Sequence, residues 1–197
     1  GQALTRTVHF STLGHSIREP SLRPRTCICA TTEEQLEPAP CHSRHRLGGQ
    51  ARLLLAGGAT LVAMMNAELV APSALVSLRA VPELQAIDVA ADGGLRIGAM
   101  LSHASLAADA RLTGGNIVIR EAVAQIAHPS VRNIGTLGGA VAHGDPSSDL
   151  PAALVAANAM IETAGPVGKR EIAAEDFFED YLTTALQAGE MVSAVLL

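Results

Sequence analysis

A chain of 197 residues can form one ordinary domain or two small ones, and it can bury a core without disulfides or metals. Its formal net charge of −5 and its lack of tryptophan offer neither a basic surface for a phosphate backbone nor many rings on which bases could stack. The composition therefore predicts a globular protein and excludes nucleic acid as a partner.

Neither a membrane span nor a metal site is expected. The longest uncharged apolar run, residues 53–67, is shorter than the roughly 20 residues that cross a bilayer, and the N-terminus lacks the apolar stretch of a secretion signal. Cys27, Cys29 and Cys41 fit neither a zinc finger nor an iron–sulfur motif. An odd number of cysteines without a secretion signal favours reduced thiols and a cytoplasmic protein.

Composition divides the chain near Gly48 and Gly49. Residues 1–50 hold every cysteine and four of the seven histidines, with little apolar periodicity. Residues 51–197 alternate apolar segments with glycine turns. We therefore expect a domain at residues 51–197, preceded by a segment of a different kind at residues 1–50.

The second part begins with two short apolar segments, at residues 51–57 and 74–78, which predict buried strands. The sequence then alternates apolar and polar residues on both sides of Asp92, Gly93 and Gly94, which is the residue set for a tight β-hairpin. Ser102 follows the hairpin. Its hydroxyl can cap the helix expected after it.

Further along, helices are expected at residues 116–127, 149–157 and 175–186, and a strand at residues 160–163. His128 and Pro129 should stop the first of these helices, because proline disfavours helix in the residue before it. Helices mixed with hairpins predict an α+β fold rather than a doubly wound parallel sheet.

Two glycine pairs suggest a binding site. Gly57 and Gly58 follow the first strand, and Gly138 and Gly139 lie in the stretch HPSVRNIGTLGGAVAHGDPSSDLP at residues 128–151. Glycine permits a positive φ and close approach to the backbone, so successive amides can converge on an anion, and a following helix N-terminus adds partial positive charge. The pattern predicts a diphosphate site, to which the hydroxyls of the neighbouring threonines, at positions 60 and 136, would contribute.

Other interpretations stay open at this point. Each glycine pair alone is typical of an ordinary turn, neither fits GxGxxG or GxxxxGKS, and a sugar-nucleotide binding protein could use the same cradle. Arg132 is expected to be an ion-pair or packing residue, and Asn133 to fix the loop by bonding its own backbone. Met64 and Met65 are expected to fill the core.

The whole stretch at residues 128–151, with VRNIGTLGG followed by AH, DP and DLP, resembles the FAD-binding subunit of the molybdenum hydroxylases, the family of xanthine dehydrogenase and aerobic carbon monoxide dehydrogenase. AGGATLVAMMN is similar to that family's first flavin loop, and IGAMLSHASL and FFEDYLTTALQAGEMVSAV also match. The likeness runs over residues 52–195. It implies a FAD-binding fold of the PCMH or vanillyl-alcohol-oxidase type, with two small α/β subdomains and FAD between them.

The resemblance implies FAD as the cofactor, with its diphosphate held between the two glycine loops. Asp149, in the DLP motif, would accept hydrogen bonds from the ribose or nearby polar atoms, and Ala140 stands where the family has Ser or Asn, which removes one possible bond. No catalytic residue is implied, since the flavin carries the redox chemistry. The implied cofactor-binding residues are Gly57, Gly58, Ala59, Thr60, Leu61, Thr136, Leu137, Gly138, Gly139, Ala140 and Asp149.

By resemblance, the chain is the FAD-binding electron-transfer subunit of a molybdopterin-dependent dehydrogenase, and passes electrons from iron–sulfur clusters through FAD to an acceptor. Its partners would be a molybdopterin-binding large subunit and a [2Fe-2S] small subunit. Residues 1–50 lack the family's first strand and helix. The family's C-terminal domain, which helps to cover the flavin, is missing after SAVLL, so we expect weaker FAD binding than in a full-length relative. The alternative is a flavin-free remnant that acts only as an interaction or assembly module.

Overall fold

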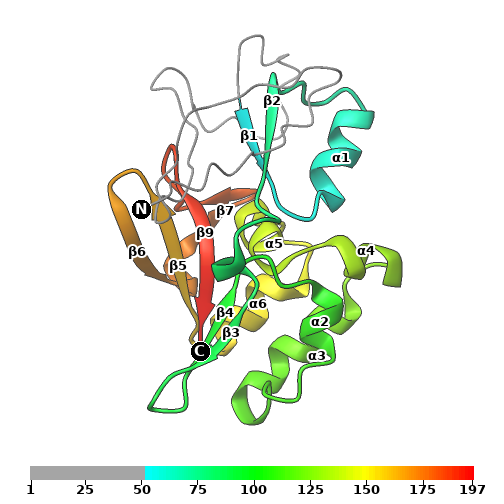
Figure 1. Cartoon of the computed structure of the whole chain (residues 1–197). Coiled ribbons are helices and arrows are strands. Elements are labelled where there is room, and N and C mark those ends of the chain that lie inside the picture. Colours follow the sequence, from blue (N-terminus) through cyan, green and yellow to red (C-terminus); the bar gives the residue numbers. More distant parts are fainter. Residues whose placement is uncertain (1–51) are drawn as a thin grey trace, which may run out of the picture.

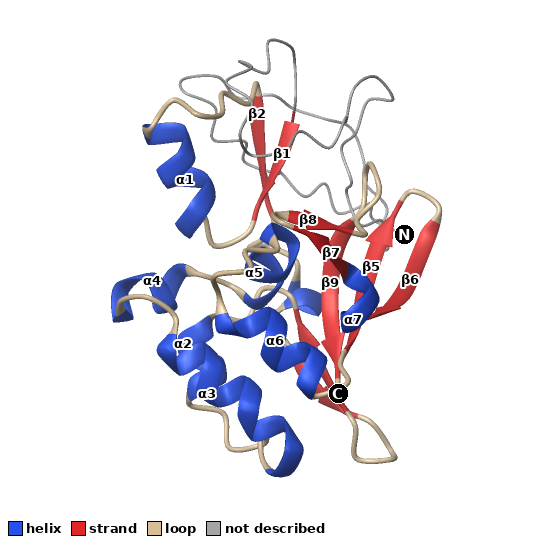
Figure 2. Ribbon diagram, turned by 180° about the vertical axis from the view of Figure 1, so that it is seen from behind, coloured by secondary structure: helices blue, strands red, loops and turns tan. Residues whose placement is uncertain are grey.

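The computed structural model describes residues 52–197. Within this range, a small parallel β-α-β unit adjoins a five-stranded antiparallel sheet with helices packed beside it (Figures 1 and 2). The expected mixture of helix and sheet is confirmed. None of the helices between residues 52 and 197 has the length and apolar character needed to cross a membrane.

The small unit consists of β1 (Arg52–Leu55), α1 (Ala59–Asn66) and β2 (Ala74–Ser77). Its strands pair in parallel, with Leu55 opposite Ser77, because the helix between them returns the chain to the starting edge. Both strands agree with the apolar segments expected at residues 51–57 and 74–78. Their carboxyl ends therefore lie side by side, and the first glycine loop leaves from one of them.

Helix α1 is apolar along its length but buries none of its residues. Met64 and Met65 are only partly buried. The expectation that these two methionines fill the core is therefore wrong, because neither belongs to, or packs against, the two buried clusters of the described residues.

The larger sheet has the strand order β3-β4-β9-β5-β6, and all neighbours are antiparallel. Its strands are β3 (Ile87–Val89), β4 (Leu95–Gly98), β5 (Met160–Gly165), β6 (Gly168–Ala173) and β9 (Met191–Leu196). The expected hairpin is confirmed as the β3–β4 connection, where Gly93 has a φ of 87° and Gly94 N donates to Asp92 Oδ1 at 3.0 Å. The sequence patterns predict β5 but neither β6 nor the central β9.

Helices pack together on one side of this sheet (Figure 2). They are α2 (His103–Ala107), α3 (Ile117–Gln125), α4 (Pro129–Ile134), α5 (Leu137–His143) and α6 (Asp149–Ala156), with 3₁₀ turns at Pro82–Leu84 and Gly114–Asn116. Ile97, Ile161 and Val195 of the sheet share one buried core with Val123 and Leu154 of the helices. Each such side chain contributes roughly 1.5–3 kcal/mol when fully buried, so this core fixes the helices on the sheet.

The expected stop at His128 and Pro129 is misplaced. Helix α3 already ends at Gln125, and Ile126 is extended. Pro129 instead occupies the first position of α4, where its missing N–H removes no helical hydrogen bond and its fixed φ suits the helix. The proline therefore starts a helix that the sequence patterns do not predict.

The helix expected at residues 175–186 is wrong. This segment contains α7 (Ala174–Phe177), β7 (Phe178–Asp180) and β8 (Thr183–Thr184). Phe177 is fully buried and meets Phe178 edge to face, with ring centroids 5.3 Å apart. Leu182, with a φ of 51°, then reverses the chain between the two short strands. Burial of the aromatic pair and this turn override the helical periodicity.

Candidate functional site

The two glycine loops lie against each other although they are far apart in the sequence. A side-chain carbon at Gly57 would overlap the carbonyl oxygen of Ile134 and lie 3.2 Å from Thr136 Cγ2. A side-chain carbon at Gly139 would lie 3.6 Å from Ala56 Cβ. Position 57 therefore requires glycine for the close approach, and the loops are placed as a shared ligand would need them.

The first loop presents unused backbone donors. Gly58 has a φ of 85° and directly precedes α1, and no N–H group of residues 57–61 donates a hydrogen bond within the part of the chain that the structure describes. The first amides of a helix have no acceptor inside the helix and carry partial positive charge. This loop can therefore bind an anion without breaking an existing hydrogen bond.

The second loop has most of its amides already bonded. Thr136 caps α5, because its Oγ1 accepts a hydrogen bond from Gly139 N at 3.2 Å. Leu137 N and Gly138 N donate to carbonyl oxygens of the segment after β4, at 2.9 and 2.8 Å. A side-chain carbon at Gly138 would overlap Ala99 in that segment. The Thr136 hydroxyl hydrogen is the donor left over, since the bond from Gly139 uses only acceptor capacity.

A cavity of about 130 Å³ lies between the two loops. Of the residues assigned to the site from the sequence, Gly57 and Thr136 line it. Its other lining residues are Ala56, Arg79, Gln85, Met100, Ser102, Asn133 and Ile134. These come from the end of β1, the turns after β2 and β4, and α4, so no local sequence pattern connects them.

The remaining residues assigned to the two loops could contact a ligand mainly through backbone atoms rather than side chains. Ala59 and Leu61 lie partly buried in the first turn of α1, whereas Thr60 is exposed there. Leu137 is fully buried in the core, and Ala140 is partly buried in α5. Of these residues, only Thr60 could therefore offer a ligand a freely accessible polar side chain.

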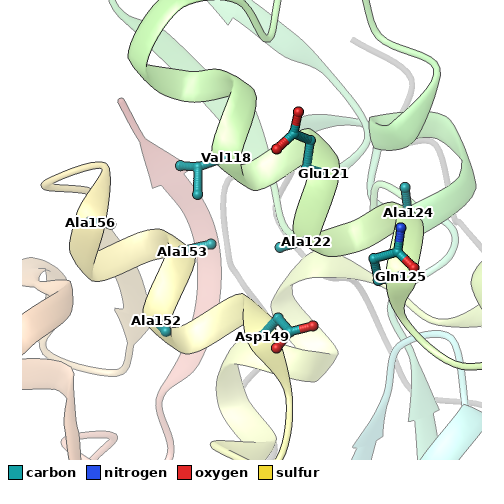
Figure 3. A pocket seen from close by; sticks show the side chains of 9 residues that line it. All are labelled: Val118, Glu121, Ala122, Ala124, Gln125, Asp149, Ala152, Ala153 and Ala156. Atoms are coloured by element: carbon teal, nitrogen blue, oxygen red, sulfur yellow. The ribbon is translucent and has the colours of Figure 1, made fainter.

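Asp149 lies apart from the cavity. It is exposed at the first position of α6 and lines a groove of about 710 Å³ between α3 and α6, together with Glu121 and Gln125 (Figure 3). This groove shares no lining residue with the cavity between the loops. A role for Asp149 at the cofactor stays a prediction.

Arg132 is a structural residue, as expected, whereas Asn133 differs from expectation. The guanidinium of Arg132 forms no ion pair within residues 52–197; it donates to the carbonyl oxygens of Ile126 and Ala127, at 2.9 and 2.7 Å, and so closes the turn after α3. The side chain of Asn133 makes no hydrogen bond within residues 52–197, although it lines the cavity. The expected bond from Asn133 to its own backbone is therefore wrong, because the residue lies in α4 and not in a loop.

His103 supports the second loop from behind, and the sequence reasoning missed it. Its backbone N donates to the carbonyl oxygen of Gly135 at 3.1 Å, and a side-chain carbon at Gly135 would lie 2.8 Å from the imidazole Cδ2. The ring is 3% exposed and its Nδ1 has no partner. Burial lowers the pKa of His103 to about 4, so the ring is neutral near pH 7.

A separate charge cluster joins the strands of the larger sheet. Glu162 of β5 accepts hydrogen bonds from Arg96 at 2.7 Å, Lys169 at 3.2 Å and Ser193 at 2.6 Å. Burial alone would raise the pKa of Glu162, but these bonds outweigh it and lower the pKa to about 2. Among residues 52–197 no group of three or more His, Cys, Asp or Glu side chains could hold a metal ion, and the three cysteines lie outside the described residues.

Comparison with known sequences identifies relatives. The model of the family described as "FAD binding domain in molybdopterin dehydrogenase" matches residues 34–197. The carbon monoxide dehydrogenase medium chain of Afipia carboxidovorans is 37% identical over 151 residues, which cover 76% of this chain and 51% of the relative. The alpha subunit of the 6-hydroxypseudooxynicotine dehydrogenase complex of Paenarthrobacter nicotinovorans is 34% identical over 148 residues, covering 75% and 50%.

Solved structures show the same likeness. Carbon monoxide dehydrogenase from Hydrogenophaga pseudoflava superposes with a TM-score of 0.71 at 35% identity, covering 76% of this chain and 52% of that one. Quinoline 2-oxidoreductase from Pseudomonas putida 86 gives a TM-score of 0.70 at 36% identity, covering 74% and 51%. This chain thus spans about half the length of the relatives that it matches. Because the family model covers most of its length, the chain belongs to the family of FAD-binding domains of molybdopterin dehydrogenases.

Proposed function

We propose that this chain is the FAD-binding, electron-transferring part of a molybdopterin-dependent dehydrogenase. The observation that carries the proposal is the meeting of the two glycine loops around one cavity, in a chain of the FAD-binding family. In this proposal the β1-α1-β2 unit and the part built on the larger sheet correspond to the two subdomains of a PCMH-type fold, with FAD between them. The boundary near residue 50 stays a prediction, and the family match begins at residue 34.

The residues present fit the diphosphate of FAD. Gly57 lets the first loop approach the segment at residues 134–136 closely, and the free amides of residues 57–61 can each donate to a phosphate oxygen. On the other side, Thr136 keeps one hydroxyl hydrogen to donate. Gly138 and Gly139 contribute mainly by letting α5 pack closely, since their amides are already bonded.

The chain's own residues would bind and orient the cofactor, and no acid–base pair is needed. Bound FAD supplies the chemistry of accepting electrons and passing them on. The names of the relatives, a medium chain and an alpha subunit of a complex, support a multi-subunit assembly. We propose a molybdopterin-binding large subunit and a [2Fe-2S] small subunit as partners, with electrons passing from iron–sulfur clusters through FAD to an acceptor.

Flavin binding by the intact chain tests the proposal. The purified chain, incubated with FAD and separated from free cofactor, should be yellow, and dithionite should bleach its flavin absorbance. ADP should compete with FAD, because both carry the diphosphate that the loops would bind. A folded, colourless chain that takes up no FAD would contradict the proposal and favour a flavin-free interaction module.

A further inference from the structure

The cavity between the glycine loops has one charged residue in its lining, Arg79. Its other lining side chains are apolar, amide or hydroxyl groups. Arg79 follows β2 in the turn that leads to the 3₁₀ helix Pro82–Leu84. It belongs to neither glycine loop and to no motif found in the sequence.

Topology brings Arg79 to the same edge as the first glycine loop. Strands β1 and β2 are parallel, with Leu55 opposite Ser77, and the pairing continues with a bond from Leu78 N to Leu55 O at 3.0 Å. Gly57 lies two residues beyond Leu55, and Arg79 lies two residues beyond Ser77. The carboxyl ends of the two strands therefore bring the glycine backbone of the first loop and the side chain of Arg79 to one edge.

The backbone of Arg79 is held at this place by its neighbours. Its carbonyl oxygen accepts a hydrogen bond from Gln85 Nε2 at 2.6 Å, and its N–H donates to Ser77 Oγ at 3.4 Å. Gln85 itself lines the cavity. The turn is thus fixed by its own contacts, while the guanidinium takes no part in them.

The guanidinium of Arg79 has no partner within the described residues, in contrast to most arginines there. Arg96, Arg111 and Arg170 each pair with a carboxylate, and Arg132 donates to two backbone carbonyls. Within residues 52–197 the guanidinium of Arg79 makes no ion pair and no hydrogen bond. An arginine without a carboxylate, beside unused amides, retains its full capacity to bind an anion.

We propose that Arg79 is a cofactor-binding residue that contacts the diphosphate of FAD and supplies the positive charge of the site. The proposal rests on the proposed FAD function. The amides of residues 57–61 would orient the phosphates through hydrogen bonds. Arg79 would add a positive charge beside them, in a chain whose formal net charge is −5. Hydrogen bonds to charged groups contribute enough that loss of Arg79 should weaken FAD binding about tenfold to a hundredfold.

Titration of the intact chain with three probes tests this assignment. Arg79→Ala should weaken binding of FAD and of ADP by similar factors and leave riboflavin, which has no phosphate, unchanged. Arg79→Lys, which keeps the charge but loses the planar fork, should show a smaller loss. Arg120→Ala is the control, because the guanidinium of Arg120 in α3 also has no hydrogen bond or ion pair within residues 52–197, but Arg120 lines neither the cavity nor the groove. It should change the dissociation constant for FAD by less than about twofold.

The outcomes separate this inference from the function on which it rests. Wild-type chain that binds FAD together with an Arg79→Ala variant that binds FAD equally well would overturn the role of Arg79 and leave the flavin function intact. An equal loss of riboflavin binding in the variant would also overturn it, because the effect would then come from the fold. Wild-type chain that binds none of the three probes would overturn the flavin function itself.

Discussion

The two glycine loops each place a glycine pair near the start of a helix, yet they use their backbones differently. In the first loop the amides of residues 57–61 have no acceptor within the described chain. In the second, Leu137, Gly138 and Gly139 donate to the protein itself. Both glycine pairs allow segments to pack closely, but only the first also leaves backbone donors available for a ligand. A shared motif therefore does not imply a shared role, and the hydrogen-bond partners decide between them.

The largest effect is expected from Gly138→Ala in the second loop. The new methyl group would overlap Ala99 Cβ and lie 3.0 Å from Ala99 Cα, and neither the helix nor the segment after β4 can move without breaking the bonds between them. We expect the free energy of unfolding to fall by roughly 3 kcal/mol, as for an overpacked core. Denaturant unfolding measures it.

Gly115→Ala provides the control for this change. Gly115 lies in the 3₁₀ turn Gly114–Asn116, and nothing lies within 4 Å of the position that a side-chain carbon would take. Its substitution should change the stability by less than about 0.5 kcal/mol. Equal stability of the two variants would show that close packing is not the role of the second loop.

Lowering the pH should destabilise the protein through His103, which packs against the second loop. The pKa of His103 is lowered to about 4, so the unfolded chain binds this proton first as the pH falls. The contribution of His103 is therefore complete above about pH 6.5 and is lost toward pH 4, which predicts a decrease in unfolding free energy of about 2 kcal/mol between pH 7 and pH 5.

Thermal unfolding over this pH range measures the effect, and His103→Gln should remove most of the slope. His128→Gln, which changes an exposed ring, is the matched control. Glu162 affects stability in a lower pH range: because its pKa is about 2, the stability that its ionised carboxylate contributes is lost only below about pH 4.5. A slope that persists in His103→Gln would show that another group is responsible.

Thr136→Val removes one hydroxyl group and so tests whether Thr136 stabilises α5 as its N-terminal cap. The variant keeps the shape of the side chain but removes the acceptor for Gly139 N. We expect the stability to fall by about 1 kcal/mol, as for other helix caps. Chemical denaturation checks this, and an unchanged midpoint would mean that water replaces the cap without loss.

Thr60→Val makes the same chemical change in the first loop, where the smallest change in stability is expected. Thr60 is exposed and its hydroxyl makes no hydrogen bond within residues 52–197, so stability should change by less than about 0.5 kcal/mol. FAD affinity should instead fall by about fivefold, if the hydroxyl donates to a phosphate oxygen. Fluorescence titration with FAD distinguishes a ligand-directed loop from a structural one.

Sequence patterns predict the elements whose causes are local. The hairpin follows from Asp92, Gly93 and Gly94, and the cap at Ser102 is confirmed by its bond from Ser105 N at 3.1 Å. Strand β9 was missed because an apolar run buried between two partners has no alternation to reveal it. The segment at residues 175–186 has helical spacing, but the burial of Phe177 decides its structure.

The residues of the candidate site also fall into those that a local sequence pattern reveals and those that only the tertiary structure reveals. Glycine loops can be recognised in a sequence because their chemistry lies in consecutive residues. Arg79 and His103 could not be recognised, since each matters through a segment far from it: Arg79 beside Gly57, and His103 beneath Gly135. Pairings of this kind become visible only when the order of strands and the packing of helices are known.

The central place of β9 has a consequence for how this protein is made. Hairpins β3–β4 and β5–β6 can form early during translation, but β9, which joins them, is the last strand of the described range to leave the ribosome. Until then, each hairpin carries an open edge that β9 later covers. The nascent chain must therefore keep two unfinished half-sheets from pairing with other polypeptides until synthesis delivers the strand that unites them.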